Sequence, residues 1–255
     1  MAQDLPGYLD LLKRSRPEEI VVISKELDPA FELTALVVKL EREAKRLRPV
    51  LICERMKGTK FPVLTNLHAS RSRLALAMGS APDQMLPTYL HAMDKPIPPK
   101  VVKTGPCKDV VLTGERINLY DLPQILHHEG DAGAYITAAI SFAKDPTREI
   151  WNCAYNRLQI KSRNTTSIHL TTGKHLWEFQ RIAEARNEPL PLALVIGVHP
   201  AIALGALAIG SIDEDERGIM GGLLGEPLEL VKCRTSGVLV PAHAELVLEC
   251  EILPG

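Results

Sequence analysis

The chain has 255 residues, which is the size of one large domain or of two ordinary ones. Its 45% hydrophobic and 24% charged residues are typical of a globular protein, and its net charge of -1 with 4% aromatic residues argues against a nucleic-acid-binding class. We expect no membrane span and no signal peptide, because no apolar run is long enough for either. The five scattered cysteines predict neither disulfides nor structural zinc, so we expect a cytoplasmic protein.

The first 98 residues alternate expected helices with expected strands, which indicates an α/β lobe. Asp28 followed by Pro29 is typical of a helix start, and apolar residues at helical spacing extend that helix through Leu47. Gly79 is expected to end a later helix. The expected helices cover 8–13, 28–47, 70–79 and 81–93, and the expected strands cover 18–27, 48–56 and 61–67.

A proline-rich crossing at 93–106 predicts a domain boundary, with domains at 1–98 and 107–255. After it the sequence is mostly strand-like, and one amphipathic helix at 174–186 and a short helical turn at 201–208 interrupt the strands. The expected strands cover 109–114, 134–145, 149–160, 166–172, 190–198, 228–233, 237–241 and 244–253. Overall we expect an α/β (α+β) fold, in which an N-terminal α/β lobe precedes a split β-barrel.

Polar side chains interrupt apolar surroundings at four places in the second domain. Asn152 and Arg157 lie in or beside one expected strand, His175 opens the helix after it, and Glu226 lies between a glycine-rich turn and a strand. Amide, imidazole and carboxylate groups can bind a divalent cation, and a helix start near basic residues can hold a phosphate. Each residue also has an ordinary structural reading, as a strand-edge amide, a helix cap or a loop acid.

Two further motifs have weaker functional readings. The run "HHEGD" at 127–131 has the residue types of a metal site, although such runs are more often surface loops. The run "GIMGGLLGE" at 218–226 lacks the GxGxxG spacing of a dinucleotide-binding fingerprint, and no helix is expected to follow it.

Four long segments together resemble the UbiD family of reversible decarboxylases. They are "NLHASRSRLALAMG", "PCKDVVLTGERINLYDLP", "NCAYNRLQI" and "LLGEPLELVKCRTSGVLVPAHAELVLECEILPG". The similarity covers nearly the whole chain in one register. The resemblance implies a prenylated FMN cofactor, supplied by a flavin prenyltransferase, and the reversible non-oxidative decarboxylation of an aromatic or α,β-unsaturated carboxylic acid.

The resemblance also implies roles for particular residues. A manganese (or magnesium) ion would bridge the cofactor phosphate to Asn152, His175 and Glu226, and Arg157 would anchor the reacting carboxylate as a catalytic residue. The remaining implied cofactor-binding residues are Cys153, Tyr155, Asn156, His169, Leu170, Thr171 and Lys174. A potassium ion is implied on the backbone carbonyls of Cys153, Gly205, Ala206 and Ala208.

The family's catalytic acids are expected just after the "ILPG" segment, where this sequence ends. We therefore expect a truncated member that lacks the C-terminal domain and is a homo-oligomer when full length. Two alternatives stay open, a non-catalytic flavin-binding fragment or subunit and a plain FMN reductase. Asn152, His175 and Glu226 together favour a UbiD-like protein over the reductase, which needs no metal on the flavin phosphate.

Overall fold

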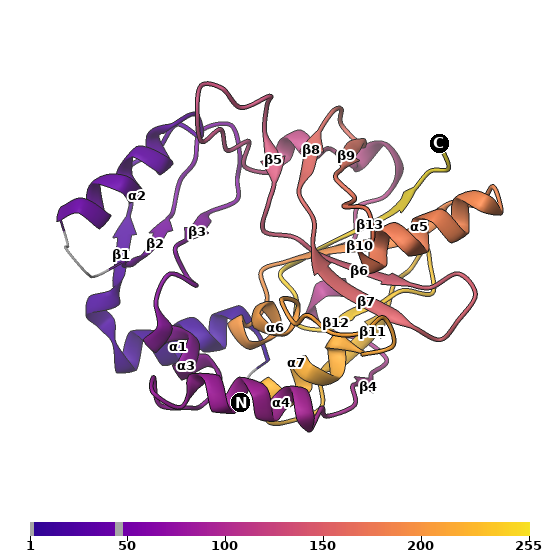
Figure 1. Cartoon of the computed structure of the whole chain (residues 1–255). Coiled ribbons are helices and arrows are strands. Elements are labelled where there is room, and N and C mark those ends of the chain that lie inside the picture. The colour runs from indigo at the N-terminus through magenta and orange to yellow at the C-terminus, as the bar shows by residue number, and fades with distance from the viewer. Residues whose placement is uncertain (1–2, 44–47) are drawn as a thin grey trace.

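The computed structural model describes residues 3–43 and 48–255 and confirms a mixed α/β fold (Figure 1). The helices are α1 (Leu5–Ser15), α2 (Glu32–Glu43), α3 (Arg71–Ala77), α4 (Met85–Asp94), α5 (His175–Ala185), α6 (Pro200–Gly205) and α7 (Glu216–Leu224), with 3-10 turns at Pro17–Glu19, Pro106–Lys108, Gly114–Arg116 and Leu119–Asp121. The strands are β1 (Ile20–Ile23), β2 (Val50–Cys53), β3 (Val63–Thr65), β4 (Lys100–Val101), β5 (Tyr135–Ile136), β6 (Ile140–Lys144), β7 (Trp151–Tyr155), β8 (Leu158–Ile160), β9 (Thr166–Ile168), β10 (Leu190–Ile196), β11 (Glu229–Lys232), β12 (Leu239–Pro241) and β13 (Leu246–Ile252). In this part of the chain, no helix has both the length and the apolar character needed to cross a bilayer.

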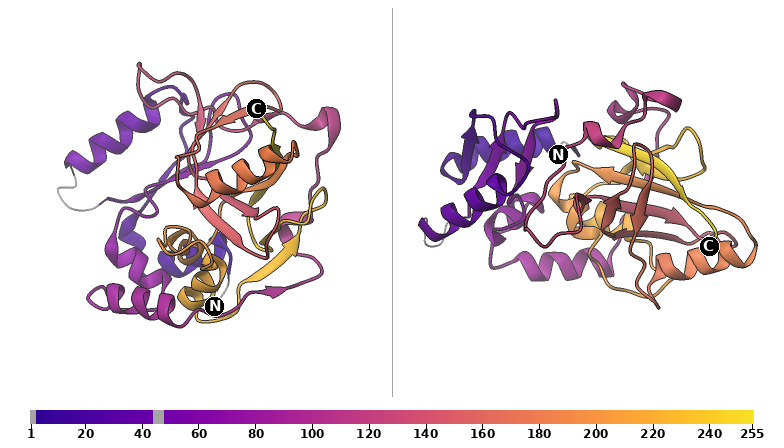
Figure 2. Two further views of the ribbon diagram at one scale, coloured as in Figure 1. Left: turned by 45° about the vertical axis from the view of Figure 1, so that its right-hand side comes forward. Right: turned by 90° about the horizontal axis from the view of Figure 1, so that it is seen from above.

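The N-terminal sheet has the order β1-β2-β3 and lies at one side of the molecule, while the sheets built from residues 100–252 lie at the other (Figure 2). Helix α2 begins at Glu32, so the expectation that it begins directly after Asp28 was wrong. Ala30 instead forms a parallel bridge with Leu126, and Phe31 has a φ of 70°, a left-handed conformation outside the helical range. The expected helix residues 44–47 lie outside the described residues.

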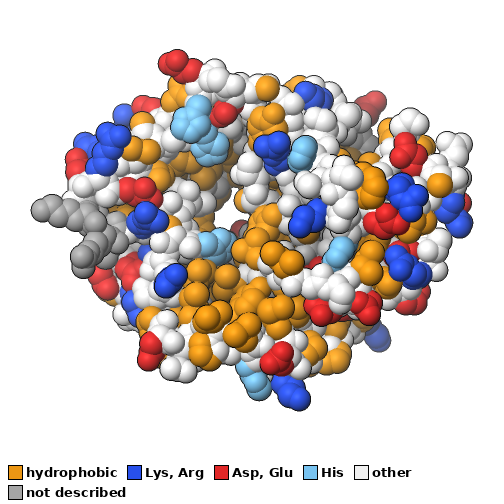
Figure 3. All heavy atoms as spheres, in the orientation of Figure 1, with side chains coloured by type: hydrophobic (Ala, Val, Ile, Leu, Met, Phe, Trp, Pro, Cys, Tyr) orange, Lys and Arg blue, Asp and Glu red, His pale blue; other side chains and the backbone are white. Residues whose placement is uncertain are grey.

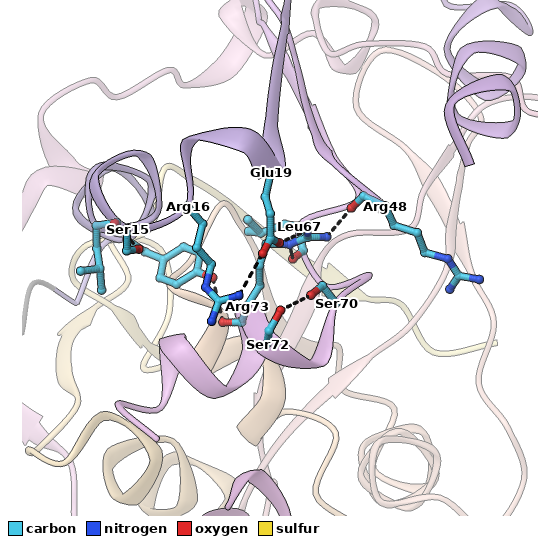
Figure 4. Close-up of polar contacts among 10 residues, drawn as sticks. Ser15, Arg16, Glu19, Arg48, Leu67, Ser70, Ser72 and Arg73 are labelled. Carbon is cyan, nitrogen blue, oxygen red and sulfur yellow. Dashed lines mark hydrogen bonds and ion pairs between the residues drawn. The ribbon is translucent and has the colours of Figure 1, made fainter. Parts of the chain in front are cut away.

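A buried arginine connects the segments of the N-terminal lobe (Figure 4). The Arg73 side chain is 1% exposed, and its Nη1 donates to Glu19 Oε2 at 2.6 Å. Arg16 Nη1 donates to the other carboxylate oxygen of Glu19 at 3.1 Å. The remaining guanidinium N–H groups of Arg73 donate to the backbone carbonyls of Arg48, Asn66 and Leu67. Every charge in this network is therefore paired inside the protein.

The second part of the chain is built on a sheet with the order β13-β10-β6-β7. Strand β10 is apolar on both faces because helices cover both faces. Leu192 and Leu194 belong to a core with Phe179 of α5, whereas the alternate residues Ala193 and Val195 belong to a core with α6 and α7. Strand β7 is at the edge of this sheet, between α5 and α7, where its outward backbone groups need partners from outside the sheet.

The glycine-rich stretch at 218–226 is a helix through most of its length, so the expected turn was wrong. Its glycines allow close packing against the N-terminal lobe. A Cβ atom at Gly222 would lie 3.0 Å from Ala92 Cβ of α4, and one at Gly221 would lie 2.4 Å from the Ile97 carbonyl oxygen. The glycine content of α7 therefore reflects helix packing.

Two other local expectations also change. Residues 109–114 form no strand in the described structure, and Val110 there is 79% exposed. The expected strand at 149–160 is two strands, β7 and β8, which belong to different sheets and are separated by Asn156 and Arg157. The domain boundary near residue 100 stays a prediction, and α4, which precedes it, packs against α7 from beyond it.

Candidate functional site

A buried carboxylate, Glu216, joins three elements of the second part of the chain. Asn152 Nδ2 of β7 donates to Glu216 Oε1 at 3.0 Å, and the Cys153 backbone N–H donates to Oε2 at 3.2 Å. His175 Nδ1, at the start of α5, lies 4.0 Å from Glu216 Oε1. The amide, imidazole and carboxylate groups of Asn152, His175 and Glu216 thus come together, although 64 residues separate the first from the last.

Local structure explains how each group arrives there. Asn152 alternates along β7 with Trp151 and Cys153, which enter the core with α7, so the amide faces the side of α5. His175 is the first residue of α5, and Glu216 is the first residue of α7. Asp215 is the N-cap residue of α7, and its side chain accepts a hydrogen bond from the Arg217 backbone N–H.

Burial makes the Glu216 carboxylate unusual. Loss of solvent raises its pKa to about 7, although hydrogen bonds from its own backbone, Cys153 and Asn152 oppose the shift. Burial, followed by the nearby negative charge of Glu216, also raises the pKa of the Cys153 thiol well above its ordinary value. The site therefore favours a bound positive charge, because a cation would stabilise the ionised form of Glu216.

The donor set fits a divalent cation. Carboxylate oxygen, amide oxygen and imidazole nitrogen suit manganese and magnesium, and rotation of the Asn152 amide would present its oxygen in place of its nitrogen. In the described residues, no group of three or more His, Cys, Asp or Glu side chains has the arrangement of a metal site. This set contains two such side chains, and Asn152 supplies the third donor.

The structure joins Glu216 to Asn152 and His175, whereas Glu226 lies at the other end of α7. It follows Gly225, the left-handed residue that ends α7, and its backbone N–H donates to the Gly221 carbonyl. Glu216 lies at the opposite end of the same helix. At about 1.5 Å of rise per residue, the helix from Glu216 to Leu224 is roughly 12 Å long. Glu216 and Arg217, at the start of α7, make the side-chain contacts with β7 described here, so Glu216 lies where Glu226 was expected.

The other predicted residues lie around the turn after β7 and the segment before α5. Arg157 and His169 are exposed and adjacent, since the His169 N–H donates to the Arg157 carbonyl at 3.2 Å, and Asn156 Nδ2 lies 3.5 Å from the His169 carbonyl. Thr171 and Lys174 are exposed before α5, with Leu170 and Tyr155 half-buried. The space-filling view has a central hollow, with Lys, Arg and His side chains around it (Figure 3). These flavin and substrate roles stay predictions.

The carbonyls predicted to bind potassium belong to β7 and to the end of α6. Cys153 lies on β7 beside Glu216. Gly205 is the last residue of α6, and Ala206 and Ala208 lie just after it. The Gly205 carbonyl already accepts from the Ala208 N–H at 3.1 Å. The potassium site also stays a prediction.

Family models match both parts of the chain. Residues 100–255 match the 3-octaprenyl-4-hydroxybenzoate carboxy-lyase Rift-related domain (UbiD), and residues 11–93 match the corresponding N-terminal domain. Anhydromevalonate phosphate decarboxylase from Methanothermobacter thermautotrophicus is 29% identical over 238 residues, which are 93% of this chain and 53% of that relative. The chain spans about half the length of the curated relatives it matches.

Solved structures of enzymes have the same fold. The UbiD-class enzyme HmfF from Pelotomaculum thermopropionicum, in complex with FMN, is 40% identical with a TM-score of 0.91, and the match covers 99% of this chain and 55% of that one. The closed form of vanillic acid decarboxylase from Sedimentibacter hydroxybenzoicus is 29% identical with a TM-score of 0.92, and the match covers 100% and 56% of the two chains.

Proposed function

This chain belongs to the UbiD family, and on that premise we propose that it is the cofactor-binding part of a carboxy-lyase. The proposed reaction is the reversible non-oxidative decarboxylation of an aromatic or α,β-unsaturated carboxylic acid with prenylated FMN. The chain spans about half the length of its curated relatives. We therefore propose, rather than infer from these relatives, that the whole protein turns over such a substrate.

The meeting of Glu216, Asn152 and His175 carries this proposal. The carboxylate is 6% exposed, yet its polar partners here are an amide, a backbone N–H and a partly exposed imidazole. We assign these three side chains to a divalent cation, manganese or magnesium, which would hold the flavin phosphate. The bound prenylated flavin would supply the electron sink for loss of carbon dioxide.

The exposed residues beside the cation site have complementary roles in the proposal. Arg157 would bind the substrate carboxylate, since a guanidinium forms two parallel hydrogen bonds with a carboxylate. Lys174 would add positive charge near the phosphate, just before the N-terminus of α5. Arg157 and Lys174 would thus bind and orient the substrate and the cofactor, and would not themselves transfer the proton to the product.

The first experiment compares two acids on one helix. Mn2+ and flavin binding would be measured for the wild-type chain, Glu216→Gln and Glu226→Gln, with the chain produced alongside a flavin prenyltransferase. Loss of a direct ligand should weaken Mn2+ affinity in Glu216→Gln by at least the roughly 10- to 100-fold that loss of a ligand-orienting residue costs, and leave Glu226→Gln close to wild type. Equal Mn2+ affinity in all three proteins would remove Glu216 from the site.

The second experiment separates a carboxy-lyase from a non-catalytic flavin-binding subunit. Carbon dioxide release would be followed from a panel of aromatic and α,β-unsaturated acids, and the reverse reaction in concentrated bicarbonate. Flavin retention with turnover supports the proposed reaction. Flavin retention without turnover for any acid in the panel would favour the non-catalytic alternative.

A further inference from the structure

Arg217, the residue after Glu216, is fixed on two sides. Its Nε and Nη2 donate to the two carboxylate oxygens of Asp215 at 2.8 and 2.6 Å. Its guanidinium carbon lies 4.0 Å from the centre of the Trp151 ring. The arginine is 6% exposed, and its Nη1 is buried without a hydrogen-bond partner in the described structure. The indole face is therefore the second partner of this buried cation.

The same two elements also meet through Glu216. Trp151 and Asn152 are neighbours on β7, and Arg217 and Glu216 are neighbours on α7. The elements are joined twice, by Arg217 against Trp151 and by Glu216 against Asn152 and Cys153. The contact of Arg217 with Trp151 holds the first turn of α7 at the edge of the sheet. In that position the Glu216 carboxylate can reach Asn152 and Cys153.

We propose that Arg217 is a positioning residue that holds the Glu216 carboxylate against β7. Only arginine meets both requirements, because its planar group can bind Asp215 through two N–H donors and stack on Trp151 at the same time. Lysine would keep the charge but lose the two-donor geometry and the flat stacking surface. Replacing Arg217 with lysine should therefore make the position of the Glu216 carboxylate less fixed, without removing a charge from the site.

The test uses Arg217→Lys with a matched control elsewhere in the chain. Arg148 also donates to an aspartate through Nε and Nη2, in this case to one oxygen, Asp145 Oδ2, at 2.9 and 2.6 Å, in the turn between β6 and β7. Arg148→Lys therefore removes a comparable two-donor aspartate contact away from the start of α7. Both variants and the wild-type chain would be compared in thermal unfolding, so that general destabilisation is measured separately.

The first readout is Mn2+ affinity, measured by the electron paramagnetic resonance signal of the free ion. Loss of a residue that orients a ligand typically weakens metal binding by about 10- to 100-fold, which we expect for Arg217→Lys. Arg148→Lys should bind Mn2+ as wild type does. This readout rests on the proposed function, because it assumes that Glu216 is a ligand.

The second readout does not depend on any metal. The Cys153 amide donates to Glu216, so its hydrogen-exchange rate in metal-free protein reports where the carboxylate lies. Arg217→Lys should accelerate this exchange by about tenfold or more relative to amides of β10, towards the rate in Glu216→Ala. Trp151→Phe, which keeps a smaller aromatic face, should give a weaker acceleration and serves if Arg217→Lys does not fold.

The outcomes separate this inference from the proposed function. If wild type binds no Mn2+, the cation site fails, and the exchange rate alone decides the role of Arg217. Faster exchange at Cys153 in Arg217→Lys or Trp151→Phe, absent in Arg148→Lys, supports the positioning role. Wild-type exchange at Cys153 in a folded Arg217→Lys, or the same acceleration in Arg148→Lys, overturns it.

Discussion

Two glutamates of this chain, Glu19 and Glu216, are equally buried, each 6% exposed, but they have opposite surroundings. Glu19 lies in the N-terminal lobe, and Arg73 and Arg16 donate to its two carboxylate oxygens. Glu216 accepts from an amide and a backbone N–H, and within the described residues its ionisable partner is the His175 imidazole at 4.0 Å. One carboxylate is paired with arginines of the protein, and under the proposed function an external cation would compensate the other.

Under the proposed function, this difference would separate a structural network from a binding site. Ion pairs that are complete inside the protein connect the elements of the fold, and removing one partner leaves an uncompensated charge. A buried acid among neutral donors instead has a raised pKa, about 7 for Glu216, and is a common feature of functional sites. The predictions below test whether the two acids respond in opposite ways.

The largest effect is expected in the N-terminal network. Arg73→Met removes the buried partner of Glu19 and the donors to three backbone carbonyls. Breaking a buried pair on one side costs about 3–5 kcal/mol, so the free energy of unfolding, measured in urea, should fall by that amount. Mn2+ affinity of the folded fraction should not change.

An exposed pair provides the control for Arg73. Arg181 donates to Glu178 through two bonds, but its side chain is 57% exposed. Arg181→Met should leave the free energy of unfolding close to that of wild type, because exposed ion pairs contribute little. Similar losses in the two variants would mean that burial of the Glu19–Arg73 pair does not matter.

The acid of the candidate site shows where sequence reasoning stopped. Sequence patterns selected Asn152 and His175 as candidates, because each is a polar residue in a clear strand or at the start of a clear helix. They did not identify Glu216, because three of the four glycines in "GIMGGLLGE" lie within α7, reduce its helix propensity and concealed it. A signal was present in Asp215, a good helix cap, followed by apolar residues at helical spacing.

Other features depended on contacts that no local pattern contains. The strand-like residues at 109–114 stay unpaired because strand formation requires a neighbouring edge, which is a tertiary property. In contrast, β10 and α5 were predicted close to their observed bounds, since β10 is a continuous apolar run and α5 has apolar residues at helical spacing. Packing of the start of α7 against β7 places Glu216, and not Glu226, beside Asn152, and no local sequence pattern contains that contact.

A third buried titratable group, His199, tests burial without an ion pair. The His199 ring is 1% exposed, packs edge-to-face on Tyr8, and has a buried Nε2 without a partner in the described structure. Burial lowers its pKa from 6.5 to about 4, and the Asp4 carboxylate only partly opposes this shift. Between these values the unfolded chain binds more protons, so stability should fall by about 3 kcal/mol as the pH drops from 6.5 to 4.

His199→Asn separates this effect from other acid titrations. Asparagine can keep the cap, because its oxygen can accept from the Ala201 backbone N–H that His199 Nδ1 now binds. The difference in unfolding free energy between wild type and variant should shrink steadily below about pH 6. A difference that is constant with pH would show that His199 does not titrate in this range.

Arg157 tests the exposed side of the candidate site. Under the proposed reaction, Arg157→Lys should leave bound flavin unchanged and lower turnover by about a hundredfold, about 2.7 kcal/mol in the activation free energy, because the two-donor anchor is lost. Arg163→Lys is the matched control, since Arg163 is also exposed and donates to the Glu115 carbonyl away from Glu216. Equal turnover in the two variants would remove Arg157 from the catalytic residues.

The smallest expected effect is the change in unfolding free energy caused by Glu216→Gln. It tests the comparison of Glu19 with Glu216 most directly, because its sign should depend on whether a cation is bound. Without metal at about pH 8, Glu216 is mostly ionised, and Glu216→Gln should raise the free energy of unfolding by about 1 kcal/mol by removing a buried charge. With saturating Mn2+ the wild type gains binding energy that the amide cannot match, so the order should reverse. Glu19→Gln, whose acid is paired with Arg73 and Arg16, should be destabilising with and without Mn2+. If Glu216→Gln is as destabilising as Glu19→Gln in metal-free protein, then Glu216 is a second structural acid and the proposed cation site loses its physical basis.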